Sequence, residues 1–207
     1  HDQCCAPQPR PDDAATRRVL WAVLALNGGM FAVEVAAGLM AGSASLQADA
    51  LDFLGDAANY GISLMVVGLA LRYRAMAALA KSASMGLFGL WVIGMVVWHA
   101  LRGTVPEPLT MGAIGLLALA ANAAAFGLLY AFRRGDANLR SAWICTRNDV
   151  LGNVAVLGAA AGVFGTGTGW PDLIVAAVMA TLAMQGAWTV LRQALGELRH
   201  GSPQPAE

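Results

Sequence analysis

The chain has 207 residues, of which 57% are hydrophobic and 13% are charged, and its formal net charge is zero. The mean hydropathy of +0.58 lies far above that of soluble globular domains and excludes most soluble folds. No basic run is longer than two residues, so nucleic-acid binding has no electrostatic basis and we expect none.

Six stretches almost free of charge follow one another along the chain, over residues 19–40, 46–71, 82–101, 109–132, 141–164 and 173–191. Each is long enough to cross about 30 Å of hydrocarbon as a helix. The pattern predicts an all-α polytopic membrane protein with six transmembrane helices. We divide the chain into a flexible cytoplasmic segment (1–16), the transmembrane domain (17–195) and a short cytoplasmic tail (196–207).

The basic residues predict the orientation in the membrane. The segments before the first span, between spans two and three, between four and five, and after the sixth hold 11 of the 13 Lys and Arg residues. Lys81 is counted among them, in the connection after span two. The connections on the other side hold only Arg102. Because cytoplasmic loops collect Lys and Arg, both termini are predicted to be cytoplasmic.

Charged residues also occur inside the predicted spans: Glu34, Asp49, Asp52, Asp56, Arg147 and Asp149. A charge at mid-bilayer costs about 2.5–3.5 kcal/mol even on the most lenient scale, so these side chains must face protein or water. At about 100° per residue, Asp49, Asp52 and Asp56 share one face of the second span. One arginine cannot neutralise five carboxylates, so this face is predicted to hold a cation. Pairing with buried basic groups is the alternative, and it applies most to Asp49.

The fifth span carries a matching pair, because Cys145 and Asp149 are four residues apart and share a helix face. Together with Asp52 and Asp56 they make a predicted metal site of three carboxylates and one thiolate. Four such ligands suit a tetrahedral site for zinc or cadmium. Alternatively, Cys145 is a small residue that only packs against its neighbours and binds no metal.

These two segments resemble the cation diffusion facilitator family. The segment GSASLQADALDFLGD is similar to the family's second helix, in which Ala-Asp-Ala precedes His or Asp and, four residues later, Asp. The segment NLRSAWICTRNDVLGN is similar to the fifth helix, with Asp149 on its Asp and Cys145 where His is usual. Further matches lie in the first helix and at the start of the sixth: Asn27, Glu34, Gly38, Gly42, Ser43, Trp170, Pro171 and Asp172.

The resemblance implies a secondary transporter, in the bacterial inner membrane, that exports a divalent metal in exchange for protons by alternating access. Zn²⁺ or Cd²⁺ is the expected transported substrate. Acidic and thiol ligands lose protons when they bind metal, which suits such an exchange. No ATPase motif or activated nucleophile occurs, so we expect neither an enzyme nor an organic cofactor. The expected partners are the metal ion, protons, membrane lipid and a second copy in a homodimer.

The family usually adds a cytoplasmic ferredoxin-like domain, and the sequence is expected to represent a short form without it. Asp49, Glu34 and Arg147 are expected to orient a ligand or relay protons. Arg147 is expected to pair with Glu34, with an acidic residue at a dimer interface as the alternative. Metal capture at the N-terminus is a further hypothesis, with an inert tail as the alternative; its residues are His1, Cys4 and Cys5. Two other functions stay open: a non-transporting partner subunit of a heterodimer, and a passive cation channel.

Overall fold

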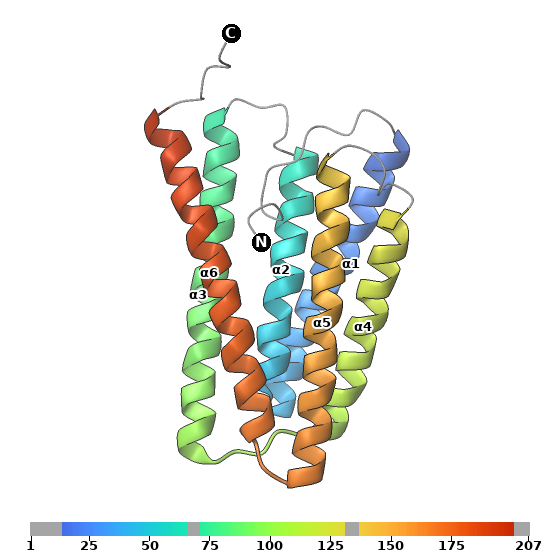
Figure 1. The fold of residues 1–207 in the computed structure, drawn as a ribbon, viewed down its shortest axis with the longest axis vertical. Coiled ribbons are helices and arrows are strands. Elements are labelled where there is room, and N and C mark those ends of the chain that lie inside the picture. The colour runs from blue at the N-terminus through green and yellow to red at the C-terminus, as the bar shows by residue number, and fades with distance from the viewer. Residues whose placement is uncertain (1–13, 66–70, 131–136, 201–207) are drawn as a thin grey trace.

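The computed structural model contains six antiparallel α-helices, and it describes residues 14–65, 71–130 and 137–200 (Figure 1). The helices are α1 (Ala14–Ala41), α2 (Ala44–Met65), α3 (Leu71–Arg102), α4 (Pro108–Tyr130), α5 (Ala137–Thr166) and α6 (Trp170–His200). No β-strand occurs within these ranges, so the predicted all-α fold is confirmed. α1 begins and α6 ends at the same end of the bundle, which we call the cytoplasmic end after the charge prediction. The opposite end is the outer end.

Five of the helices are long and apolar enough to cross a membrane, and α2 is the exception among the described segments. Its three Asp residues lower its hydropathy. However, 13 of its 22 residues are buried. Because α2 is largely surrounded by protein, it does not need the apolar surface that a lipid-facing helix needs.

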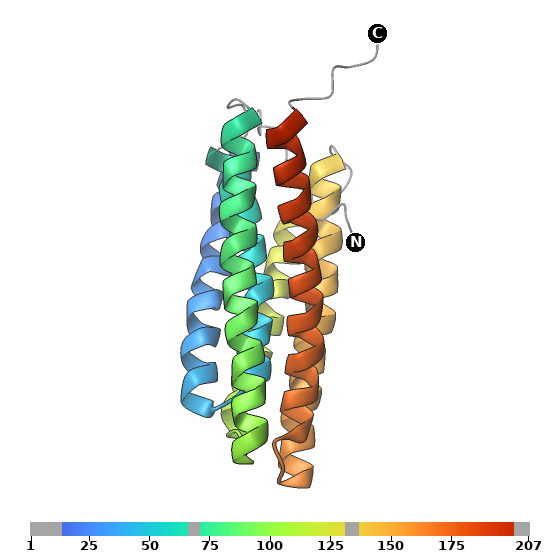
Figure 2. The ribbon, with the colours of Figure 1, turned by 90° about the vertical axis from the view of Figure 1, so that its left-hand side faces the viewer.

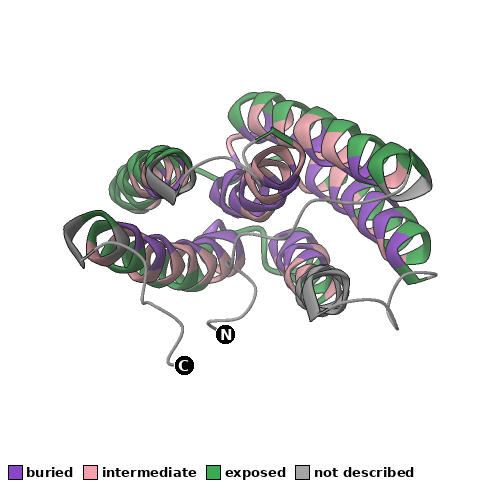
Figure 3. Ribbon diagram, turned by 90° about the horizontal axis from the view of Figure 1, so that it is seen from above, coloured by how far each residue is buried: buried purple, intermediate pink, exposed green. Residues whose placement is uncertain are grey.

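α2 lies at the centre of the bundle and contacts each of the other five helices. α3 packs mainly against α6, beside which it lies in Figure 2, whereas α1 packs mainly against α2 and α4 mainly against α5. α1 also contacts α4, and α2 also contacts α5. Seen along the bundle, the buried faces point inward and the exposed faces point outward (Figure 3). The fold therefore combines a four-helix group (α1, α2, α4 and α5) with a two-helix group (α3 and α6), and α2 contacts both.

The start of the third helix differs from the prediction. α3 begins at Leu71 rather than at residue 82, so Arg72, Arg74 and Lys81 belong to the helix and not to a connection. Lys81 is only 6% exposed and hydrogen-bonds to α2. Its assignment to a cytoplasmic loop is therefore wrong, because the helix extends beyond the charge-free stretch and turns this side chain into the bundle. The other basic residues at the cytoplasmic end still outnumber Arg102.

The outer end of α2 is held by α6. Only Gly42 and Ser43 separate α1 from α2, and Gly42 has a φ of 65°, a conformation that favours glycine. Asp172, in the first turn of α6, accepts hydrogen bonds from the Ser43 hydroxyl (2.7 Å) and from the backbone N–H groups of Ala44 (2.8 Å) and Ser45 (3.0 Å). A carboxylate at a helix N-terminus satisfies unpaired N–H groups and interacts favourably with the helix dipole. Asp172 thus fixes the helix that carries the acidic residues.

Candidate metal site

The acidic residues of α2 form a line that faces α5. Asp49 is fully buried, Asp56 is 8% exposed and Asp52 is partly buried. A Cβ atom added at Gly152 of α5 would lie 3.3 Å from Asp52 Oδ2 and 3.4 Å from Asp49 Oδ1. α5 therefore presents bare backbone to these carboxylates, and glycine at this position permits the close approach of the two helices.

Asp149 of α5 lies opposite Asp56. The carboxyl groups of these two residues are within hydrogen-bonding range of each other, and Asp149 also interacts electrostatically with Asp52. The Tyr60 hydroxyl donates a hydrogen bond of 3.3 Å to Asp56 Oδ2. Two carboxylates this close cannot both carry an uncompensated charge without strong repulsion, so they either share a proton or hold a cation between them.

A second pair of carboxyl groups lies toward the outer end. Glu34 of α1 and Asp49 of α2 are both fully buried, and none of their four carboxylate oxygens has a hydrogen-bond donor in the described part of the chain. The two groups face each other closely enough to share a proton when one of them is protonated. Buried acceptors without a donor are costly, so this pair favours uptake of a proton or a cation.

The described side chains do not by themselves form a metal cage. Among the side chains that the structure describes, which do not include that of Cys145, no three His, Cys, Asp or Glu groups converge closely enough to hold a metal ion. The acids of α2 extend over about 10 Å along the helix, at about 1.5 Å per residue. They form a line rather than a cage. A full set of ligands therefore needs a further residue or a closer approach of α2 and α5.

Two of the predicted residues of α5 have side chains outside the part that the structure describes, Cys145 and Arg147. Cys145 lies one helical turn before Asp149, on the cytoplasmic side. Its role as the fourth ligand stays a prediction, and so does the pairing of Arg147 with Glu34. The N-terminal candidates precede the first described residue and also stay predictions: His1, Cys4 and Cys5.

Sequence reasoning missed the roles of three residues that lie beside the acidic line. Gly152 packs against two of the carboxylates. The only feature of the sequence that could have pointed to it is its position three residues after Asp149. Tyr60 is one helical turn after Asp56, where an aromatic residue is ordinarily read as packing. Lys81 is the only lysine of the chain, which could have singled it out for closer inspection.

Comparison with known proteins gives the family. Residues 20–199, most of the chain, match the family described as the cation efflux transmembrane domain. The chain belongs to the cation efflux family. The resemblance predicted from the second and fifth helices is thereby confirmed. Membership also agrees with the apolar helices, so the chain is an integral membrane protein of a transporter family rather than of an enzyme family.

Several bacterial members of the cation efflux family are similar in sequence, which supports the predicted inner-membrane location. The zinc transporter ZitB of Escherichia coli is 30% identical over 93% of this chain and 66% of its own length. The metal cation efflux system protein CzcD of Cupriavidus metallidurans is 26% identical over 92% of this chain and 64% of its own length. A cadmium, cobalt and zinc/H⁺–K⁺ antiporter of Bacillus subtilis is 23% identical over 93% of this chain and 67% of its own length. The chain thus spans about two thirds of these relatives.

Proposed function

We propose that this protein exports a divalent metal cation, with zinc and cadmium favoured, in exchange for protons. The observation that carries the proposal is the buried line of carboxylates on α2 that meets Asp149 of α5 inside a membrane bundle. Ionisable side chains inside membrane helices mark ion pathways in transport proteins. The names of the relatives, which include zinc transport and cadmium, cobalt and zinc antiport, support the same class of substrate.

Proton exchange follows from the chemistry of the ligands. Asp52, Asp56 and Asp149 must be ionised to bind a metal, and the Cys145 thiol must lose its proton to act as the fourth ligand. Metal binding therefore releases protons, and proton uptake releases metal. The buried pair of Glu34 and Asp49 adjoins the line and supports a relay of protons toward the outer end.

Alternating access requires one group of helices to move relative to another. The division of the bundle into a four-helix group and the pair α3 and α6 supports such a movement, because α2, which carries the acidic line, also contacts both helices of the pair. We further propose that the protein works as a homodimer in the lipid bilayer and uses no organic cofactor.

Metal flux into proteoliposomes, measured with and without a pH gradient, tests this function. Uptake of zinc or cadmium that is driven by a more acidic lumen supports the antiporter. Metal uptake should then make the lumen more alkaline, because protons leave as metal enters. Flux that ignores the pH gradient favours the passive channel instead. Absence of flux, with the protein correctly inserted, contradicts the proposal and favours a non-transporting partner subunit.

A further inference from the structure

Lys81 places a positive charge beside the candidate metal site. The sequence contains 12 arginines but only this one lysine. The side chain comes from α3, is 6% exposed, and donates a hydrogen bond from Nζ to Asn59 Oδ1 of α2. A lysine in the first turns of a membrane helix ordinarily extends toward water. Here it extends to a neighbouring helix, so its burial needs an explanation in terms of the groups that it meets.

The antiparallel register of α2 and α3 fixes what Lys81 meets. A Cβ atom at Gly55 of α2 would lie 3.1 Å from the end of Met85, one helical turn after Lys81. The α2 segment that faces Lys81 and Met85 therefore runs from Gly55 to Asn59 and includes Asp56. Residues three apart on a helix are neighbours on its surface, so an ammonium bound to Asn59 lies next to Asp56. Lys81 and Asp56 indeed interact electrostatically across the two helices.

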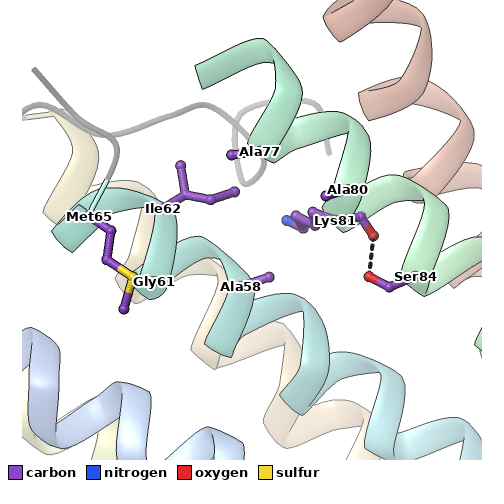
Figure 4. A pocket seen from close by; sticks show the side chains of 8 residues that line it. All are labelled: Ala58, Gly61, Ile62, Met65, Ala77, Ala80, Lys81 and Ser84. Atoms are coloured by element: carbon purple, nitrogen blue, oxygen red, sulfur yellow. Dashed lines mark hydrogen bonds between the residues drawn. The ribbon is translucent and has the colours of Figure 1, made fainter. Parts of the chain in front are cut away.

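A groove beside Lys81 offers the side chain a second position. It has a volume of about 480 Å³ and lies between the cytoplasmic ends of α2 and α3. Figure 4 shows Lys81 reaching from α3 toward α2 at the edge of this groove, among Ala58, Ala77 and Ala80. The residues nearest Lys81 are small, and toward the cytoplasmic end the groove continues past the larger side chains of Ile62 and Met65. The groove is open to the outside of the bundle, so a long, flexible side chain has room to swing along it.

We propose that Lys81 is a built-in counter-cation of the metal site: its ammonium partly neutralises Asp56 while the site holds no metal, and it moves into the groove when a divalent cation takes Asp56. The inference rests on the proposed function and adds a determinant of metal affinity to it. Lys81 keeps its positive charge throughout and only its side chain moves, so no covalent bond is made or broken. Because Lys81 belongs to the α3 and α6 pair, metal binding would also weaken one contact between the two helix groups.

Equilibrium zinc binding by the purified, detergent-solubilised protein tests the inference. Lys81→Met keeps the length of the side chain and removes the charge, so it is expected to bind zinc about tenfold more tightly than the wild type, equivalent to about 1.4 kcal/mol. Lys81→Arg keeps the charge and is expected to restore affinity close to that of the wild type. A side chain that only ties α3 to α2 predicts the opposite for Lys81→Met, because loss of a helix contact would leave affinity unchanged or weaken it. That result would overturn the inference.

Chemical labelling of the single lysine provides an independent measurement. Acetylation of Lys81, followed by mass spectrometry, is expected to become several-fold faster when zinc is added to the wild type. It is expected to be insensitive to zinc in Asp52→Ala, which lacks a metal ligand. A labelling rate that zinc leaves unchanged or lowers, in a wild-type protein that binds zinc, overturns the inference while leaving the proposed function intact. A wild-type protein that binds no zinc contradicts the proposed function itself.

Discussion

Replacing Asp172 by alanine is expected to destabilise the outer end of the bundle more than most single substitutions. Asp172 is 1% exposed and accepts three hydrogen bonds, from the Ser43 hydroxyl and from the N–H groups of Ala44 and Ser45. The substitution leaves the buried N–H groups of Ala44 and Ser45 without their acceptor, and it leaves the Ser43 hydroxyl only Ser45 Oγ, at 3.4 Å, as an acceptor. It also removes a negative charge from the N-terminus of α2.

The expected loss in the free energy of unfolding follows from the number of hydrogen bonds that Asp172 accepts. A hydrogen bond to a charged group contributes about 1.5–3 kcal/mol, and an unsatisfied buried donor adds a cost of similar size. Because the three bonds share one carboxylate, their contributions are not additive. We therefore expect Asp172→Ala to lower the free energy of unfolding by about 3–5 kcal/mol, within the range of a broken buried network. Asp172→Asn retains one acceptor oxygen and should lose less.

The measurement is the thermal stability of each variant in detergent. The folded fraction that remains after heating is quantified by size-exclusion chromatography with fluorescence detection. Glu107→Ala is the matched control, since Glu107 caps α4 in the same way through Leu109 N (3.1 Å) and Thr110 N (2.6 Å) but is exposed to solvent. A smaller loss is expected for this control. If Asp172→Ala is as stable as the wild type, or no less stable than Glu107→Ala, then Asp172 does not hold α2 in place.

The control also has an expected pH dependence. Hydrogen bonds from Thr110, through its side chain and then its backbone N–H, lower the pKa of Glu107. A carboxyl group whose pKa is lower in the folded state stabilises the fold above its unfolded pKa, and the contribution disappears as the pH falls through the folded pKa. The stability difference between wild type and Glu107→Ala should therefore persist at neutral pH and shrink in acid.

Three further predictions concern orientation, metal preference and charge pairing. A single cysteine at Gly167 should react with an impermeant reagent from outside the cell, and one at Gly135 only from the cytoplasm; the reverse pattern would overturn the orientation. Cys145→Ser should lose cadmium transport more than zinc transport, because sulfur binds cadmium relatively better than oxygen does. Cys145→His should keep zinc transport. If Cys145→Ala transports both ions as well as the wild type, Cys145 is excluded as a ligand. Arg147→Leu should reduce the yield of folded protein more than its combination with Glu34→Leu, since the single variant leaves a buried carboxylate unpaired; equal yields would remove support for this pairing.

Hydrophobic length and charge were sufficient to predict the number and order of the helices. The six charge-free stretches all lie within helices or overlap them, because a bilayer admits few alternatives to a continuous helix. The ends were predicted less well. Helix α3 continues about three turns beyond the apolar stretch, at about 3.6 residues per turn, because hydrogen bonding within the helix does not require apolar side chains. Lys81 was misplaced for this reason.

The candidate site was partly accessible from sequence. Helical periodicity places Asp49, Asp52 and Asp56 on one face, and burial cost turns that face inward. Periodicity cannot tell which helix lies opposite, so the contact of Gly152 with the carboxylates is visible only in three dimensions. The same holds for Asp172, which acts on residues more than 120 positions earlier in the chain. Contacts between distant segments depend on packing rather than on local pattern.

Zinc titration of the purified protein tests whether a metal ion binds between α2 and α5. We expect one zinc ion per chain in the wild type. Asp56→Asn and Asp149→Asn preserve side-chain shape but remove a charge from each helix in turn, and each should weaken binding about 100-fold or more, equivalent to about 2.7 kcal/mol. Wild-type affinity and stoichiometry in either variant would contradict a site shared by the two helices.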